Sequence, residues 1–194
     1  MAPVGWARLD FGPWRPVPVG VADSEVRRRT VISSRHEDEF RGFCNLMARR
    51  LGALRDGSFG SPELAWAMSR FELGAERADS HEALSDYLLA LRALLEPEGP
   101  SASRLPQRLA LICARPEERG GLAERVAEGV SLEHAVITGA ARGDADEAEL
   151  VDEMAGHLRA LLRDVLCGHL DADVVSVADA VLAEDLADTA AAPA

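Results

Sequence analysis

The sequence has no lysine, one asparagine, one glutamine and three isoleucines among its 194 residues. Aromatic residues make up only 5% of the chain, whereas alanine and leucine contribute 33 and 25 residues. β-Branched and aromatic residues favour strands, while alanine and leucine favour helices. This shortage argues against a β-sandwich or β-barrel and predicts an all-α fold. The use of arginine for all 21 basic residues indicates a coding bias and is not interpreted as function.

Long apolar runs and paired cysteines are also missing. No apolar segment reaches the roughly 18 residues that a membrane-spanning helix needs, and the first residues lack the apolar run of a signal peptide. Cys44, Cys113 and Cys167 are far apart and show no CxxC spacing, so we expect buried free thiols without disulfides or a zinc knuckle. No glycine-rich phosphate loop is recognisable. These features predict a cytoplasmic protein with no membrane association and no cofactor.

The net charge of −12 is unevenly distributed. Residues 1–35 carry +3, residues 36–143 carry −4 and residues 144–194 carry −11. A chain this acidic repels nucleic acid as a whole, so any contact with RNA or DNA needs a local basic patch. The best candidates for a patch that contacts nucleic acid or a partner are Arg27, Arg28, Arg29 and Arg35. A solvated turn is the alternative. The acidic last third is expected to be a solvated face or a docking surface for a basic partner.

The chain divides into three regions of different character. Residues 1–33 are punctuated by prolines and contain two tryptophans, which predicts an extended arm packed on the body of the protein. Residues 34–188 carry apolar residues at helical spacing between capping and turn signals, and we expect about six to eight helices there. Residues 189–194 are expected to be a disordered tail. The predicted core consists of Phe40, Phe43, Met47, Leu64, Phe71, Leu84, Leu88, Leu91, Leu109, Leu158, Leu161 and Val165.

Two stretches of the helical region resemble a known family. The first runs from Arg70 to Arg77 and continues from Glu82 to Leu95, and the second runs from Leu132 to Gly139. Their order and spacing resemble the HEPN superfamily, in its Apea-like all-helical branch. That branch has an R-F-x-x-A helix, an L-x-D-x-x-x-A-L-E-A-L-L helix and a closing R-N-x-I-V-H-G segment. The resemblance implies a helical bundle, commonly dimeric, and many HEPN domains are metal-independent endoribonucleases with an R-x4–6-H motif.

The closing motif is degenerate in this sequence. It places Glu133 at the arginine position, His134 at the polar second position and Thr138 at the position of the catalytic histidine, while Gly139 matches. In the family's chemistry the histidine transfers protons and the arginine stabilises the charged phosphorane. A carboxylate at position 133 would repel phosphate. The resemblance therefore implies a HEPN-like scaffold without its nuclease site.

The same alignment makes a structural prediction. Residues 132–139 should be helical and cross the core, with Val136 and Ile137 buried. Glu133 and Thr138, about 1.4 helical turns apart, should then face the same side.

An intact R-x4–6-H spacing occurs elsewhere in the chain. Arg163 and His169 are separated by five residues, and Arg29 and His36 by six. With 21 arginines such spacings arise by chance, and we interpret Arg163 and His169 as cations that suit the C-terminal end of a helix. They remain the fallback pair for a ribonuclease.

Glu153 and His157 lie one helical turn apart, as metal ligands often do, with Asp152 beside them. Glu–His pairs at this spacing are common in helices, and the pattern offers no third ligand. We therefore expect no metal site.

Three hypotheses for function follow. The leading one is a non-catalytic HEPN-like interaction or regulatory module that binds a protein partner or a nucleotide-containing ligand. The alternatives are a metal-independent endoribonuclease of the same superfamily and a structural helical assembly protein. A homodimer is expected from the resemblance, and the broad apolar surface of one long helix fits either an interface or a buried helix. That surface comprises Leu158, Leu161, Leu162, Val165 and Leu166.

Overall fold

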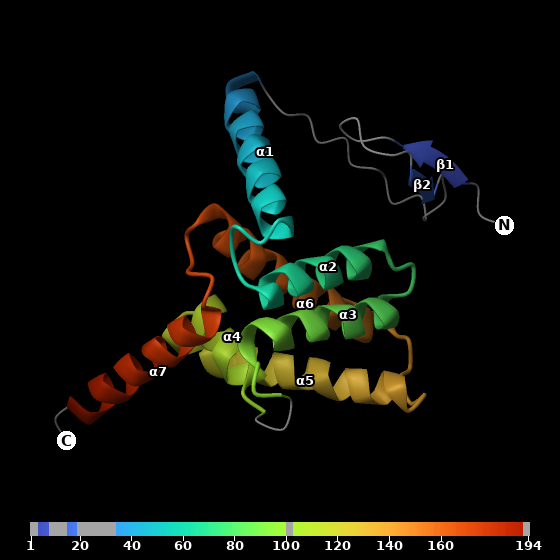
Figure 1. Ribbon diagram of the computed structural model, residues 1–194. Helices are drawn as coiled ribbons and strands as arrows, with labels where there is room; N and C mark the ends of the chain where they lie inside the picture. The colour runs from blue at the N-terminus through green and yellow to red at the C-terminus, as the bar shows by residue number, and fades with distance from the viewer. Residues whose placement is uncertain (1–3, 8–14, 19–33, 100–102, 192–194) are drawn as a thin grey trace. The chain divides into compact units, whose positions relative to one another are not determined.

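The computed structural model (Figure 1) describes residues 4–7, 15–18, 34–99 and 103–191. These residues contain seven α-helices and one two-stranded ribbon, which confirms the predicted all-α bundle. The chain divides into two compact units, Met1–Gly42 and Phe43–Ala194. No helix in the described ranges is long and apolar enough to cross a membrane.

The first unit contains a short antiparallel ribbon and the first turns of α1 (Ser34–Arg55). Strands β1 (Val4–Ala7) and β2 (Arg15–Pro18) pair so that Trp6 lies opposite Pro16. Both strands of a two-stranded ribbon are edges, where the missing N–H of a proline is tolerated. The predicted packing of the tryptophan side chains lies outside the described part of the chain.

The second unit contains the rest of α1 and six further helices. They are α2 (Pro62–Glu76), α3 (Ser80–Leu95), α4 (Leu105–Cys113), α5 (Arg119–Ile137), α6 (Ala145–Cys167) and α7 (Val174–Ala191). A single 3₁₀ turn, η2 (Pro116–Glu118), leads directly into α5. α7 extends to Ala191, past the point at which we expected the C-terminal tail to begin.

Three helices begin at caps that the sequence predicts. The Ser61 hydroxyl accepts a hydrogen bond from the Leu64 amide at the start of α2 (3.2 Å). The Asp79 carboxylate accepts from two amides in the first turn of α3. Asp144 accepts from the Glu147 amide at the start of α6 (3.0 Å). These bonds satisfy amides that have no partner within the helix, and they fix where the three helices begin.

The core is built around α3 and α6, with α2, α4 and α5 packed on them. α2 and α3 lie side by side (Figure 1) and approach closely at Gly74, where a Cβ atom would be 2.5 Å from the Tyr87 ring. The predicted core is confirmed at Leu64, Leu84, Leu88, Leu91, Leu109, Leu158, Leu161 and Val165.

Four residues predicted for the core are not fully buried. Met47 and Phe71 are half-buried, and Phe40 and Phe43 are 51% and 43% exposed. The prediction is therefore wrong for the two phenylalanines. Their spacing indicates an apolar face on α1, but spacing carries no information on what covers that face. Among the α1 side chains that the structure describes, only Leu54 is buried.

The apolar surplus of α6 is explained within the single chain. α6 contacts α2, α3 and α5, and packing on several sides needs apolar residues on more than one face. The five residues that fit either an interface or a buried helix are all buried, namely Leu158, Leu161, Leu162, Val165 and Leu166. α6 therefore gives no support to a dimer, which stays a prediction of the resemblance alone.

Candidate functional site

Glu133, at the arginine position of the degenerate motif, is bound inside the protein. It lies near the end of α5 and is 8% exposed. Its carboxylate accepts a hydrogen bond of 2.7 Å from Nη2 of Arg92 on α3. A buried carboxylate is stable only with such a partner, because burial removes its hydration. Glu133 therefore joins α5 to α3 and is not available to a ligand.

Thr138, at the histidine position, terminates α5 instead of facing Glu133. Its hydroxyl donates to the backbone carbonyls of His134 (2.9 Å) and Ala135 (3.2 Å). Gly139 follows in the left-handed conformation, with φ of +73°, which glycine adopts without strain. The two motif positions therefore do not form a pair.

The apolar part of the motif agrees only partly with the prediction. The segment is helical up to Ile137, and Val136 is half-buried against the core. Ile137 is 72% exposed, so the prediction of its burial is wrong. Val136 is the last α5 residue that packs on the core, and Ile137 lies at the helix end beyond it.

Both members of the fallback ribonuclease pair are exposed near the C-terminal end of α6. Arg163 is exposed and forms an ion pair with the adjacent Asp164 (2.8 Å). His169 is exposed beyond Gly168, whose φ of +79° ends α6. Within the described ranges no hydrogen bond or ion pair joins Arg163 to His169. The candidate basic patch lies outside the part of the chain that the structure describes, which includes neither Arg27, Arg28 and Arg29 nor the side chain of Arg35.

Glu153, the carboxylate considered as a metal ligand, is bound to an arginine. The guanidinium of Arg125 donates to it through Nε (2.9 Å) and approaches through Nη2 (2.8 Å). His157 is 3.9 Å away, and burial lowers the pKa of this imidazole. No group of three potential metal-ligating side chains occurs in the described residues.

The cysteine thiols differ in environment. Cys44 is exposed, contrary to the expectation, and Cys113 and Cys167 are half-buried. Burial raises the pKa of Cys113 to about 11, so this thiol stays protonated and unreactive at neutral pH.

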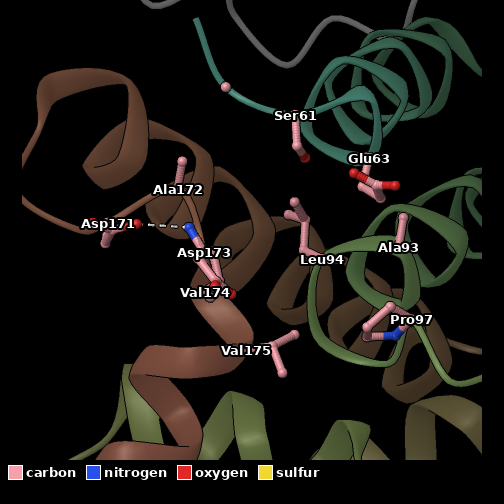
Figure 2. Close-up of a pocket in the computed structure, with 11 residues that line it drawn as sticks. Ser61, Glu63, Ala93, Leu94, Pro97, Asp171, Ala172, Asp173, Val174 and Val175 are labelled. Carbon is pink, nitrogen blue, oxygen red and sulfur yellow. Dashed lines mark hydrogen bonds between the residues drawn. The ribbon is translucent and has the colours of Figure 1, made fainter.

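A pocket lies where the start of α2, the end of α3 and the start of α7 meet. Its volume is about 540 Å³. Figure 2 shows Ser61 and Glu63 on one side, Asp173 and Val175 on another, and Leu94 between them. The lining consists of Gly60, Ser61, Glu63, Ala93, Leu94, Pro97, Asp171, Ala172, Asp173, Val174 and Val175. We call this the acidic pocket, because its only charged lining residues are three acids.

Hydrogen bonds favour the ionised form of two of these acids. The Ser176 hydroxyl and amide lower the pKa of Asp173. The Ser61 hydroxyl, followed by the backbone amide of Glu63, lowers the pKa of Glu63. Asp171 accepts a hydrogen bond of 2.8 Å from the Asp173 amide. The carboxylates of Glu63 and Asp173 are therefore negatively charged at neutral pH.

The helix ends at the acidic pocket do not cancel this charge. α2 and α7 both begin there, and each helix N-terminus contributes roughly half a positive charge. Three carboxylates outweigh two such ends by about two charges. Among the residues that the structure describes, no arginine or histidine lines the pocket. The apolar wall, with Leu94, Pro97 and Val175, adds a surface on which an aliphatic stem can pack.

A smaller pocket, of about 320 Å³, opens between α3, α4 and α5. Its two charged lining residues already have partners in the protein. Arg92 is bound to Glu133, and the Glu96 carboxylate accepts a hydrogen bond from the Arg104 amide (2.7 Å). The acidic pocket is therefore the better candidate for recognition of a charged ligand.

The sequence does not predict the acidic pocket. Ser61-Pro62-Glu63 and Asp171-Ala172-Asp173 are typical helix-start signals, which indicate where helices begin but not that a cavity lies between them. The one available clue was that both signals carry acids with no basic residue beside them.

Comparisons of the chain with protein-family models, with curated proteins and with solved structures gave no match. The resemblance to the HEPN superfamily therefore stays a prediction.

Proposed function

We propose that the protein is a non-catalytic interaction module that binds a cationic segment of a protein partner in the acidic pocket. The observation that carries the proposal is the set of three acids, Glu63, Asp171 and Asp173, lining a cavity whose described lining residues include no cation. In this proposal the scaffold is HEPN-like, its nuclease site is degenerate, and the module works as a homodimer in the cytoplasm.

A protein partner suits the pocket better than a nucleotide-containing ligand. A phosphate would meet three negative charges, whereas a guanidinium or ammonium group would complement them. Exposed ion pairs each contribute little to affinity, so the aliphatic stem of a lysine or arginine must also pack on the apolar wall. The positions of the degenerate motif support the same conclusion, because Glu133 and Thr138 have structural partners.

The test is binding of a fluorescently labelled oligoarginine peptide, measured by anisotropy at low and moderate salt. We expect binding that weakens with salt, and no binding of the matching oligoglutamate peptide or of a single-stranded RNA. The variant Glu63→Gln/Asp171→Asn/Asp173→Asn should lose most of the affinity. The control variant Glu117→Gln/Glu124→Gln/Glu149→Gln makes the same change in net charge at exposed acids outside the pocket, and it should bind like the wild type.

Equal loss in both variants would show that only net charge matters and would contradict the proposal. Cleavage of single-stranded RNA by the wild type, abolished by His169→Ala, would favour the ribonuclease instead.

A further inference from the structure

Two large apolar side chains are exposed next to the acidic pocket. Trp66 on α2 is 40% exposed, and Leu89 on α3 is 37% exposed. α2 and α3 are antiparallel neighbours joined by a short connection, and the Arg70–Asp86 ion pair (3.1 Å) fixes their register. Trp66 lies one turn before Arg70, and Leu89 lies one turn after Asp86. The two side chains are therefore at the same level of the helix pair, and we call them the apolar strip.

The apolar strip leads into the acidic pocket. One further turn along each helix brings Glu63 on α2 and Ala93 on α3, and both line the pocket. The strip and the edge of the pocket are therefore about one helical turn apart, roughly 5.4 Å along the helices. By helical spacing, the apolar strip therefore adjoins the edge of the negatively charged cavity.

The other end of the apolar strip has a different charge. The Arg70 guanidinium lies over the Trp66 ring, 4.9 Å from its centroid, and Asp86 binds both Arg70 and Arg77. The acid at that end is thus already neutralised by arginines. A cationic side chain of a partner is attracted to the pocket end and has no free carboxylate at the Arg70 end. The charges at the two ends therefore orient a partner so that its cationic side chain lies at the pocket and not at Arg70.

We propose that the partner is an amphipathic helix that places a lysine or arginine in the acidic pocket and packs a large apolar side chain, one turn away, on Trp66 and Leu89. The inference rests on the proposed function and specifies its partner. A helix fits because its side chains at i and i+4 lie on one face. The distance between them matches the distance between the strip and the edge of the pocket, about one helical turn. Apolar anchors in such grooves supply the affinity that exposed ion pairs lack.

The test uses two isomeric alanine-based helical peptides, one with arginine and leucine at i and i+4 and one with the same residues at i and i+2. Binding to the full chain is measured by fluorescence anisotropy, and circular dichroism of each variant checks folding. The i,i+4 peptide should bind at least about tenfold more tightly than its isomer. Trp66→Ala and Leu89→Ala should each weaken it about tenfold, as expected for anchor residues. Ile137→Ala, which removes an apolar side chain that is 72% exposed outside the site, should leave it unchanged.

The outcomes separate the two proposals. If the pocket variant Glu63→Gln/Asp171→Asn/Asp173→Asn loses oligoarginine binding but peptide spacing and Trp66→Ala have no effect, the amphipathic helix is wrong and the cationic site stands. If the pocket variant binds like the wild type, the proposed function itself fails. A wild-type dimer in sedimentation that Trp66→Ala converts to monomer would show that a second copy covers the strip, which also overturns the inference.

Discussion

The interior carboxylates and those of the acidic pocket differ in their surroundings. Asp86 is 3% exposed and bonds Arg70 at 3.1 Å and Arg77 at 2.9 Å. Glu133 holds the α3 arginine, and the Glu147 carboxylate accepts hydrogen bonds from two backbone amides. Each of these groups links segments that are distant in the sequence or shapes a connection between helices. Their negative charge is used within the protein.

The carboxylates of the acidic pocket have no such cationic partners. Glu63, Asp171 and Asp173 are exposed, and among the described residues none of them forms an ion pair. Their hydrogen bonds are to local amides and hydroxyls near the helix starts, which leaves the charge directed toward solvent. The difference shows that residue type and net charge do not reveal function here. What matters is whether the chain itself supplies the counter-charge.

Reversing the charge of Glu133 should have the largest effect. Glu133→Arg would place two guanidinium groups together in a buried site, and we expect a loss of about 3–5 kcal/mol in the free energy of unfolding. Urea denaturation measures it. The double variant Arg92→Glu/Glu133→Arg should recover much of the loss. Rebuilding the nuclease motif with Glu133→Arg/Thr138→His should therefore destabilise the protein, and a stable variant that cleaves RNA would contradict the assignment of Glu133.

Removing the charge of Asp86 should have a smaller effect. Asp86→Asn keeps the shape of the side chain but weakens its bonds to Arg70 and Arg77, and we expect a loss of roughly 1–3 kcal/mol. The side chains of Arg70 and Arg77 are 34% and 42% exposed, so water can hydrate both guanidinium groups when Asp86 loses its charge. Arg92, the partner of Glu133, is less exposed, and water would hydrate it less readily. Urea denaturation of Glu124→Gln, an exposed acid, provides the control and should match the wild type.

Glu147 should make stability depend on pH. The Gly143 amide, followed by groups of Arg142, lowers the pKa of this carboxyl below its ordinary value of 4.5, and His81 Nε2 faces it at 3.2 Å. Because the folded pKa is lower than the unfolded one, the stabilisation is present above pH 4.5 and is lost as pH falls through the folded value. Denaturation midpoints between neutral and acidic pH should fall less steeply for Glu147→Gln than for the wild type.

Neutralising the acidic pocket should have the smallest effect on stability. Glu63→Gln/Asp171→Asn/Asp173→Asn removes three charges without breaking an ion pair, and asparagine caps a helix as well as aspartate does. The thermal midpoint should stay close to that of the wild type while binding of the cationic peptide is lost. A large drop in the midpoint would show that these acids, like the interior ones, serve the fold.

Local features of the fold were predictable from the sequence. The caps at Ser61, Asp79 and Asp144 follow from short-range signals, because the donor and acceptor lie within three residues. The buried faces of α3 and α6 follow from apolar spacing. Phe40 and Phe43 show the limit, since the same spacing occurs on α1 without cover.

The candidate site depends on contacts that local patterns do not contain. Glu133 was singled out by alignment, but its partner Arg92 is 41 residues away, on another helix. The acidic pocket combines Glu63 of α2, Ala93 of α3 and Asp173, which directly precedes α7. Each was recognisable as a cap or a helix residue, and only the packing of α2, α3 and α7 brings them together.

Gly74 is the point at which α2 lies close against the Tyr87 ring of α3. Tyr87 is buried at 7% exposure, and a Cβ atom at position 74 would stand 2.5 Å from its ring. Because the interior is closely packed, we expect a side chain at position 74 to push α2 away from α3 close to the connection between them. Glu63 lies eleven residues along α2 from this point, about 16 Å. A small tilt of α2 at Gly74 would therefore displace Glu63 more than it displaces the residues next to Gly74. A substitution at Gly74, which belongs to neither the pocket nor the strip, would thus change the width of the pocket and the separation of Trp66 and Leu89.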